Sequence, residues 1–83
     1  MLLEGPQTLY TESGEKQWTA TFRLGKKVGD EFFYRAEGSK QWQKTYAEDG
    51  NWTWRQFDEA GRQTAESHWH NKTLIDASFS EGM

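Results

Sequence analysis

The chain has 83 residues, no cysteine and a formal net charge of −3, and 16% of its residues are aromatic against 34% hydrophobic residues in all. This length allows one domain, the lack of cysteine excludes disulfides and thiolate metal sites, and the absence of a basic excess argues against nucleic-acid and anionic-membrane surfaces. The apolar runs are too short to span a bilayer, and residues 1–4 lack the features of a signal peptide, so we expect a soluble, cytoplasmic protein.

Short segments of strand character, separated by turn residues, follow one another along the chain. Residues 16–24 show the clearest pattern, because every second residue from Trp18 to Leu24 is apolar, which is the period of a half-buried strand. Residues 25–29 read as a basic loop between two glycines, and Asp49-Gly50 is the strongest two-residue hairpin signal. The candidate strands are 7–11, 16–24, 30–36, 40–46, 52–58, 63–69 and 73–79.

Seven short strands joined by tight turns predict an all-β fold, an antiparallel meander of repeated β-hairpins. A helix is the competing interpretation for one segment, since the apolar positions between Trp54 and His68 also fit helical spacing. Gly61 in the middle of that segment favours the strand interpretation.

The meander is internally repetitive. Gly5 to Gly14 matches Gly29 to Gly38 at an offset of 24 residues, with an aromatic residue and the second glycine at the same places. The match continues through Trp18 and Trp42, and a third copy is shifted by 23 residues, with Trp52 in place of the first glycine and Ala65 in place of Trp42. We therefore expect one repeat domain over residues 1–83, with approximate repeats 5–28, 29–51 and 52–76 and a tail at 77–83.

The repeat resembles a known family. Its glycine, aromatic and glycine spacing, followed by Gly25-Lys26-Lys27-Val28-Gly29, is similar to the MORN-variant repeats of the YwqK-type antitoxin family, and the similarity covers roughly residues 5–76. The resemblance implies a hairpin-repeat sheet without enzymatic activity that acts as a protein-binding or antitoxin-like module. Trp52 in place of glycine, and Pro6 in the first copy, depart from the family pattern.

A weaker resemblance leads to a different ligand class. Gly50-Asn51-Trp52 and the segment from Phe57 to Gly61 are similar to choline-binding cell-wall repeats. That resemblance implies a carbohydrate- or cell-wall-binding module that uses exposed aromatic rings for stacking.

The sequence offers little for catalysis or metal binding. Glu66, His68 and His70 would share one face of a strand and include metal-ligand types, but no second ligand motif accompanies them, so a solvated polar face is the preferred interpretation. The carboxylate pairs lie beside turns, and the serines lack the context of an activated nucleophile. We therefore predict no catalytic residues, no metal and no cofactor.

The aromatic residues are the main functional candidates. Most would form the core of a thin sheet, but strand 30–36 and strand 52–58 are apolar on both faces, and a one-layer sheet cannot bury both faces itself. Exposed apolar patches of this kind mark interaction sites. We predict a non-catalytic protein-binding module. One expected form of this function is an inhibitor that occupies a partner's surface. A glycan-binding module is the alternative. The predicted contact residues are Phe33, Trp52, Trp54 and Trp69, and the open sheet edges leave room for a homo-oligomer.

Overall fold

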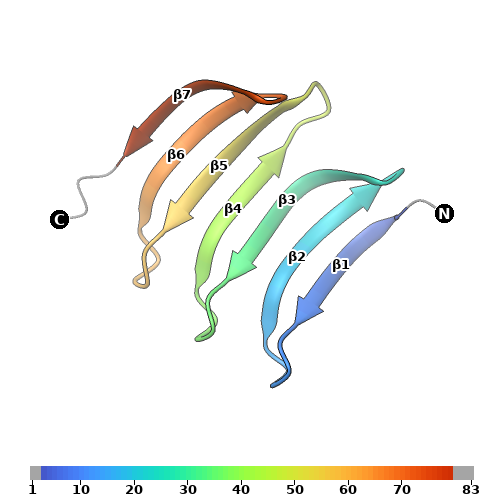
Figure 1. Cartoon of the computed structure of the whole chain (residues 1–83), viewed down its shortest axis with the longest axis vertical. Coiled ribbons are helices and arrows are strands. Elements are labelled where there is room, and N and C mark those ends of the chain that lie inside the picture. Colours follow the sequence, from blue (N-terminus) through green and yellow to red (C-terminus); the bar gives the residue numbers. More distant parts are fainter. Residues whose placement is uncertain (1–2, 80–83) are drawn as a thin grey trace.

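The computed structural model describes residues 3–79 and forms one seven-stranded antiparallel sheet (Figure 1). The strands lie side by side in chain order: β1 (Gly5–Tyr10), β2 (Lys16–Arg23), β3 (Lys26–Tyr34), β4 (Lys40–Tyr46), β5 (Asn51–Phe57), β6 (Gln63–His70) and β7 (Thr73–Phe79). The predicted all-β hairpin meander is confirmed. The helical interpretation of the segment from Trp54 to His68 is wrong, because that segment forms parts of β5 and β6 around a turn.

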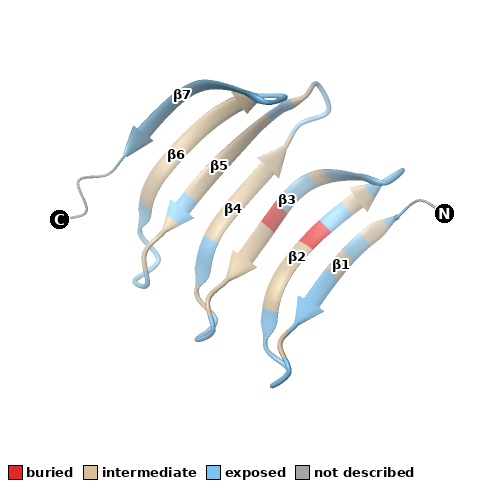
Figure 2. Cartoon of the chain, in the orientation of Figure 1, coloured by how far each residue is buried: buried red, intermediate tan, exposed pale blue. Residues whose placement is uncertain are grey.

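The sheet is a single layer. Its principal extents are 46 × 36 × 14 Å, and each strand packs only against its neighbours in the sheet. Among the described residues only Ala20 and Glu31 are buried, each 3% exposed, while most central positions are half-buried (Figure 2). The described residues include no helix long and apolar enough to cross a membrane.

Two predicted turns differ from the observed ones. The expected loop at 25–29 is shorter, because Leu24 and Gly25 both take left-handed φ angles of 50° and 79° and close a tight turn, which leaves Lys26 and Lys27 inside β3. At Asp49-Gly50 only Gly50 has a positive φ, and the Ala47 amide donates to the Asn51 carbonyl oxygen. This turn is therefore a longer loop of the kind also found at Gly14, Gly38 and Gly61.

The sequence repeat corresponds to a pair of strands. In the first two copies a glycine with positive φ lies across from an aromatic residue, with Gly5 opposite Phe22 and Gly29 opposite Tyr46. In the third copy Trp52 lies opposite Trp69 at the same position of the hairpin. The departure at Trp52 therefore keeps the register and exchanges a glycine–aromatic pair for a pair of indoles.

The two edge strands differ from the interior strands. β1 contains Pro6 and β7 is exposed along its whole length, including Leu74, Ile75 and Phe79. Residues 77–79, which the repeat boundaries assigned to a tail, belong to β7. Residues 80–83 of that predicted tail lie outside the described residues.

Candidate binding face

All five tryptophans lie on one face of the sheet. Side chains alternate between the two faces along a strand, and residues paired across strands share a face. The register pairs Trp18 with Phe33, Phe33 with Trp42, and Trp52 with Trp69. The resulting aromatic face carries Trp18, Phe22, Phe33, Trp42, Tyr46, Trp52, Trp54 and Trp69.

The four predicted contact residues all belong to the aromatic face. Phe33 stacks on Trp42 with ring centroids 5.5 Å apart, and Trp52 stacks on Trp69 at 5.0 Å. Trp54 lies beside these pairs, and its Nε1 is buried without a hydrogen-bond partner among the described residues. The structure thus brings the four residues onto one surface, although the stacked pairs show that these rings also hold the sheet together.

The opposite face is mainly polar. Threonines from β2, β4 and β5 alternate with the tryptophans, and the face includes one aromatic group, in which Phe32 stacks on Tyr34 at 6.2 Å. The Lys40 Nζ lies 5.2 Å from the ring centroids of both Phe32 and Phe57. This group accounts for the second apolar side of β3 that the sequence predicted.

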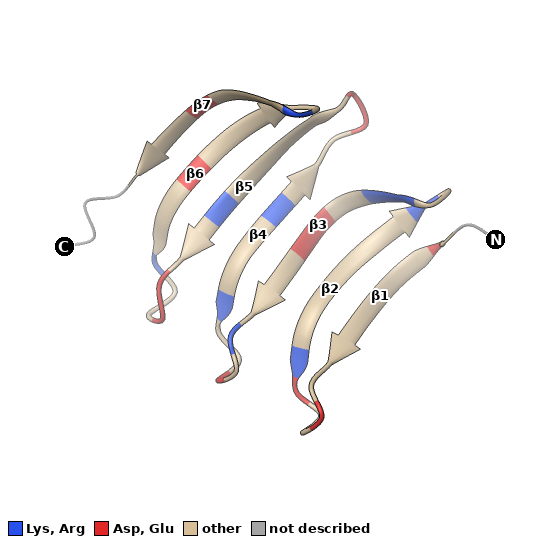
Figure 3. Ribbon diagram, in the orientation of Figure 1, with Lys and Arg blue, Asp and Glu red and all other residues tan. Residues whose placement is uncertain are grey.

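Charged residues gather toward the strand ends and turns, with a further band near the middle of β3 to β6 (Figure 3). In this band Glu31 lies opposite Lys44, and Arg55 lies opposite Glu66. The first pair belongs to the aromatic face and the second to the polar face.

Glu31 is a buried carboxylate at the centre of a hydrogen-bond network. Its Oε2 accepts from Trp18 Nε1 at 2.6 Å and from Lys27 Nζ at 2.9 Å, and its Oε1 accepts from the Tyr46 hydroxyl at 2.7 Å. Burial raises the pKa of Glu31, but the hydrogen bonds from Lys27, Trp18 and Tyr46 together lower this pKa below its usual value. The network therefore links side chains of β2, β3 and β4 by hydrogen bonds on the aromatic face.

Lys44 differs from Glu31 because its ammonium forms no ion pair with any residue that the structure describes. Its Nζ lies 5.2 Å from the ring centroids of Trp42 and Trp52 and 5.8 Å from that of Trp54. Glu31 faces it across the strands, but the oxygens of Glu31 bind other donors, and no carboxylate among residues 3–79 forms an ion pair with Lys44. Among the described residues, the ammonium of this half-buried lysine is therefore held by cation–π contacts.

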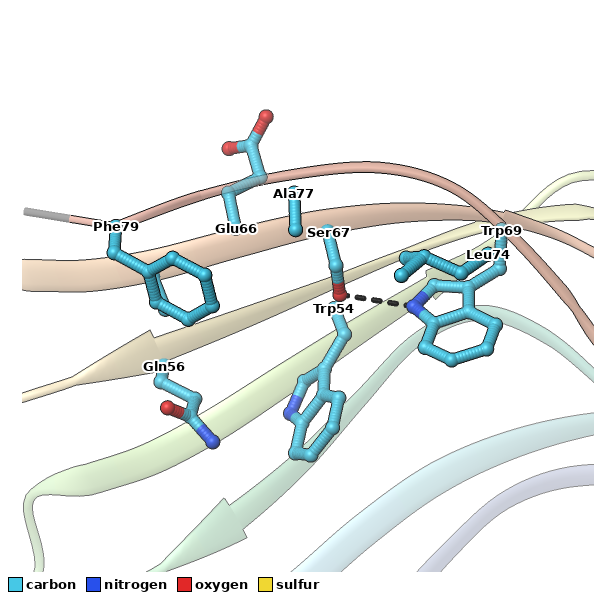
Figure 4. Close-up of a pocket in the computed structure, with 9 residues that line it drawn as sticks. Trp54, Gln56, Glu66, Ser67, Trp69, Leu74, Ala77 and Phe79 are labelled. Atoms are coloured by element: carbon cyan, nitrogen blue, oxygen red, sulfur yellow. Dashed lines mark hydrogen bonds between the residues drawn. The ribbon is translucent and has the colours of Figure 1, made fainter.

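A hollow opens in the aromatic face where the third repeat has a small residue. Ala65 occupies the position of Trp18 and Trp42, and the missing ring leaves a hollow of about 190 Å³. Figure 4 shows Trp54, Trp69, Leu74 and Phe79 on the side of the sheet where the hollow lies, while Glu66 points to the opposite side. The Trp69 Nε1 donates to Ser67 Oγ at 2.8 Å, which fixes the indole that forms one wall.

On the polar face, His68 lies between two carboxylates. Its Nε2 is 2.9 Å from Glu66 Oε2, and its Nδ1 is 2.5 Å from Asp76 Oδ1. The hydrogen bond to Asp76 is the main reason why the pKa of His68 is raised. His70 shares this face but contacts Asn51, and residues 3–79 contain no group of three or more acidic or histidine side chains arranged to hold a metal ion.

Glu31, Lys44 and Ala65 are functional candidates that were not predicted from the sequence. The signal for Ala65 was present, because the repeat alignment places an alanine where two copies have tryptophan. The signal for Glu31 and Lys44 was weaker, since a single charge inside an apolar alternation also occurs at solvent-exposed strand positions.

Comparison with known proteins adds no relative: no family model, no curated protein and no solved structure matches the chain. The resemblance to MORN-variant repeats therefore stays a prediction.

Proposed function

We propose that this chain is a non-catalytic protein-binding module that uses its aromatic face to occupy a partner's surface. The observation that carries this proposal is that all five tryptophans share one face of a one-layer sheet. The sheet does not bury this face itself, because Ala20 is the only buried apolar residue among residues 3–79. Tryptophan is among the residues that contribute most to protein–protein binding, and contiguous apolar surfaces on a protein mark interaction sites. The resemblance to antitoxin repeats adds a more specific version of this proposal, in which binding inhibits the partner.

The ring geometry favours a protein partner over a glycan. Binding of a sugar by stacking needs an open ring face, and each parallel stack closes one face of each ring: Phe33 lies against Trp42 at an interplanar angle of 10°, and Trp52 lies against Trp69 at 8°. A protein surface instead packs against ring edges and fills gaps between rings. The aromatic face offers both.

The test is affinity capture from cells of the source organism, read by mass spectrometry, with wild type, Trp54→Ala and Tyr34→Ala as baits. Trp54 lies on the aromatic face, whereas Tyr34 lies with Phe32 on the polar face and serves as the matched aromatic control. We expect a protein that wild type and Tyr34→Ala recover in near-equal amounts and that Trp54→Ala loses while its far-UV circular dichroism is unchanged. Equal recovery by all three baits would contradict the proposal, and binding of choline or glycans seen by tryptophan fluorescence would replace it with the glycan alternative.

A further inference from the structure

We propose that the partner presents a large apolar side chain next to a carboxylate, and that these two groups enter the Ala65 hollow and contact Lys44. This inference rests on the proposed function and specifies the chemistry of the partner at the same face. Trp54 joins the two parts of the site, because it lines the hollow and lies directly across from Lys44.

The hollow fits one large apolar side chain. Its walls are mainly carbon, from Trp54, Trp69, Leu74, Ala77 and Phe79, and its volume is about 190 Å³. An apolar cavity of ~150 Å³ is enough to bind benzene. The first two repeats fill this position with Trp18 and Trp42, so the sheet is already shaped for a ring there.

Lys44 supplies the charge selectivity. Lys44 is a half-buried residue whose ammonium lies near three indoles and forms no ion pair among residues 3–79, so it gains from a carboxylate that approaches from the open side. The other charges at the middle of this face, Lys27 and Glu31, form an ion pair at 2.9 Å and offset each other. Although the whole chain is acidic, the centre of its aromatic face therefore carries a net positive charge.

The same charge argues against a second copy of this chain as the occupant. Lys44 lies near the middle of β4, which is the central strand, so a two-fold face-to-face dimer with full overlap would bring two Lys44 ammonium groups together in an apolar interface. Like charges at a desolvated interface are strongly unfavourable. An acidic partner removes this conflict.

The experiment selects a displayed random peptide library on the immobilised wild-type protein and then measures the affinities of the enriched synthetic peptides by fluorescence anisotropy. The variants are Lys44→Gln, Lys44→Arg, Lys40→Gln and Ala65→Trp. Lys40 is the matched control, because its ammonium also lies over two rings but on the polar face. Ala65→Leu fills the hollow less completely and replaces Ala65→Trp if that variant does not fold.

We expect enriched peptides that combine Asp or Glu with a large apolar residue. Lys44→Gln should weaken them about tenfold and remove most of their salt dependence, while Lys44→Arg and Lys40→Gln should stay within about twofold of wild type. Filling the hollow should weaken the same peptides. The enriched peptides could instead lack acidic residues, bind Lys44→Gln as tightly as wild type and fail to bind Trp54→Ala. This result would overturn the inference about the partner's chemistry but leave the proposed function in place. If no selected peptide depends on Trp54, the proposed function fails with it.

Discussion

Replacing Glu31 with glutamine should destabilise the sheet far more than any other neutralisation of a carboxylate. The substitution keeps the size of the side chain but removes the charge that accepts from Trp18, Lys27 and Tyr46. An amide has one acceptor oxygen, so at least one of these donors loses its partner. A buried donor left without a partner costs its full desolvation energy.

The magnitude follows from the exposure of the network. Removing one member of a buried ion pair costs about 3–5 kcal/mol, and a hydrogen bond to a charged group contributes about 1.5–3 kcal/mol. Glu31 is 3% exposed, but the side chain of Lys27 is 38% exposed, so water screens that contact and replaces part of it. We expect a loss of about 2–4 kcal/mol, a large part of the stability of a domain of this size.

The assay is urea unfolding followed by tryptophan fluorescence, with the free energy of unfolding extrapolated to water. It also has a pH arm. The pKa of Glu31 is lower in the folded state than the usual value of 4.5, so its stabilisation is present above that value and is lost as the pH falls through the folded pKa. The wild type should therefore lose stability below about pH 4.5, and the glutamine variant should lose less over the same range.

The matched control is Glu48→Gln. Glu48 pairs with Arg23 at 3.6 Å, but the two side chains are 88% and 69% exposed, and neutralising an exposed pair of this kind changes stability by about 0–1 kcal/mol. If Glu31→Gln costs no more than Glu48→Gln, the network does not stabilise the fold and the reasoning is wrong.

Three further predictions concern other parts of the sheet. The pKa of His68 is raised mainly by its hydrogen bond to Asp76, so the contact stabilises below the unfolded pKa near 6.5 and is lost as the pH rises through the folded pKa; an NMR titration should show this raised pKa, and Asp76→Asn should return it toward 6.5. Gly14→Ala should cost about 1–2 kcal/mol for its φ of +89° alone, and Gly50→Ala should cost more, since its added Cβ would lie 2.6 Å from the Asn71 side chain; equal losses in urea unfolding would contradict this steric argument. Trp52→Ala should cost at least the ~0.5–1.5 kcal/mol that the stack on Trp69 contributes, and an unchanged unfolding midpoint would show that the stack adds nothing.

Much of the fold could be predicted because side-chain alternation is a local signal. The bounds of β4 and β7 match the predicted segments 40–46 and 73–79, and the repeat offset of 24 residues matches one hairpin. The turns were harder. The sequence Asp49-Gly50 suits a two-residue hairpin, but which residues take a positive φ depends on how the flanking strands pair, and here only Gly50 does.

The binding face could be predicted only in part. Alternation places Trp52 and Trp54 on the same side of their own strand, but whether Phe33 shares that side depends on the register between strands, where a slip of one residue would reverse it. That Lys44 lacks an ion pair with Glu31 could not be predicted from β3 and β4 alone. The carboxylate of Glu31, which lies opposite Lys44, accepts hydrogen bonds from donors on β2 and β4 instead. No local pattern reports such an arrangement.

The pairing of each strand with its chain neighbours alone has a consequence for how such a protein changes in evolution. Contacts between elements occur only between consecutive strands, and two copies of the hairpin superimpose in sequence at a constant offset. Duplication or loss of one hairpin therefore leaves the remaining contacts in place, as in other repeat proteins whose stability is a sum over neighbours. The length of the sheet can then vary independently of its architecture, while a single substitution such as tryptophan to alanine in one copy changes the surface at that copy alone.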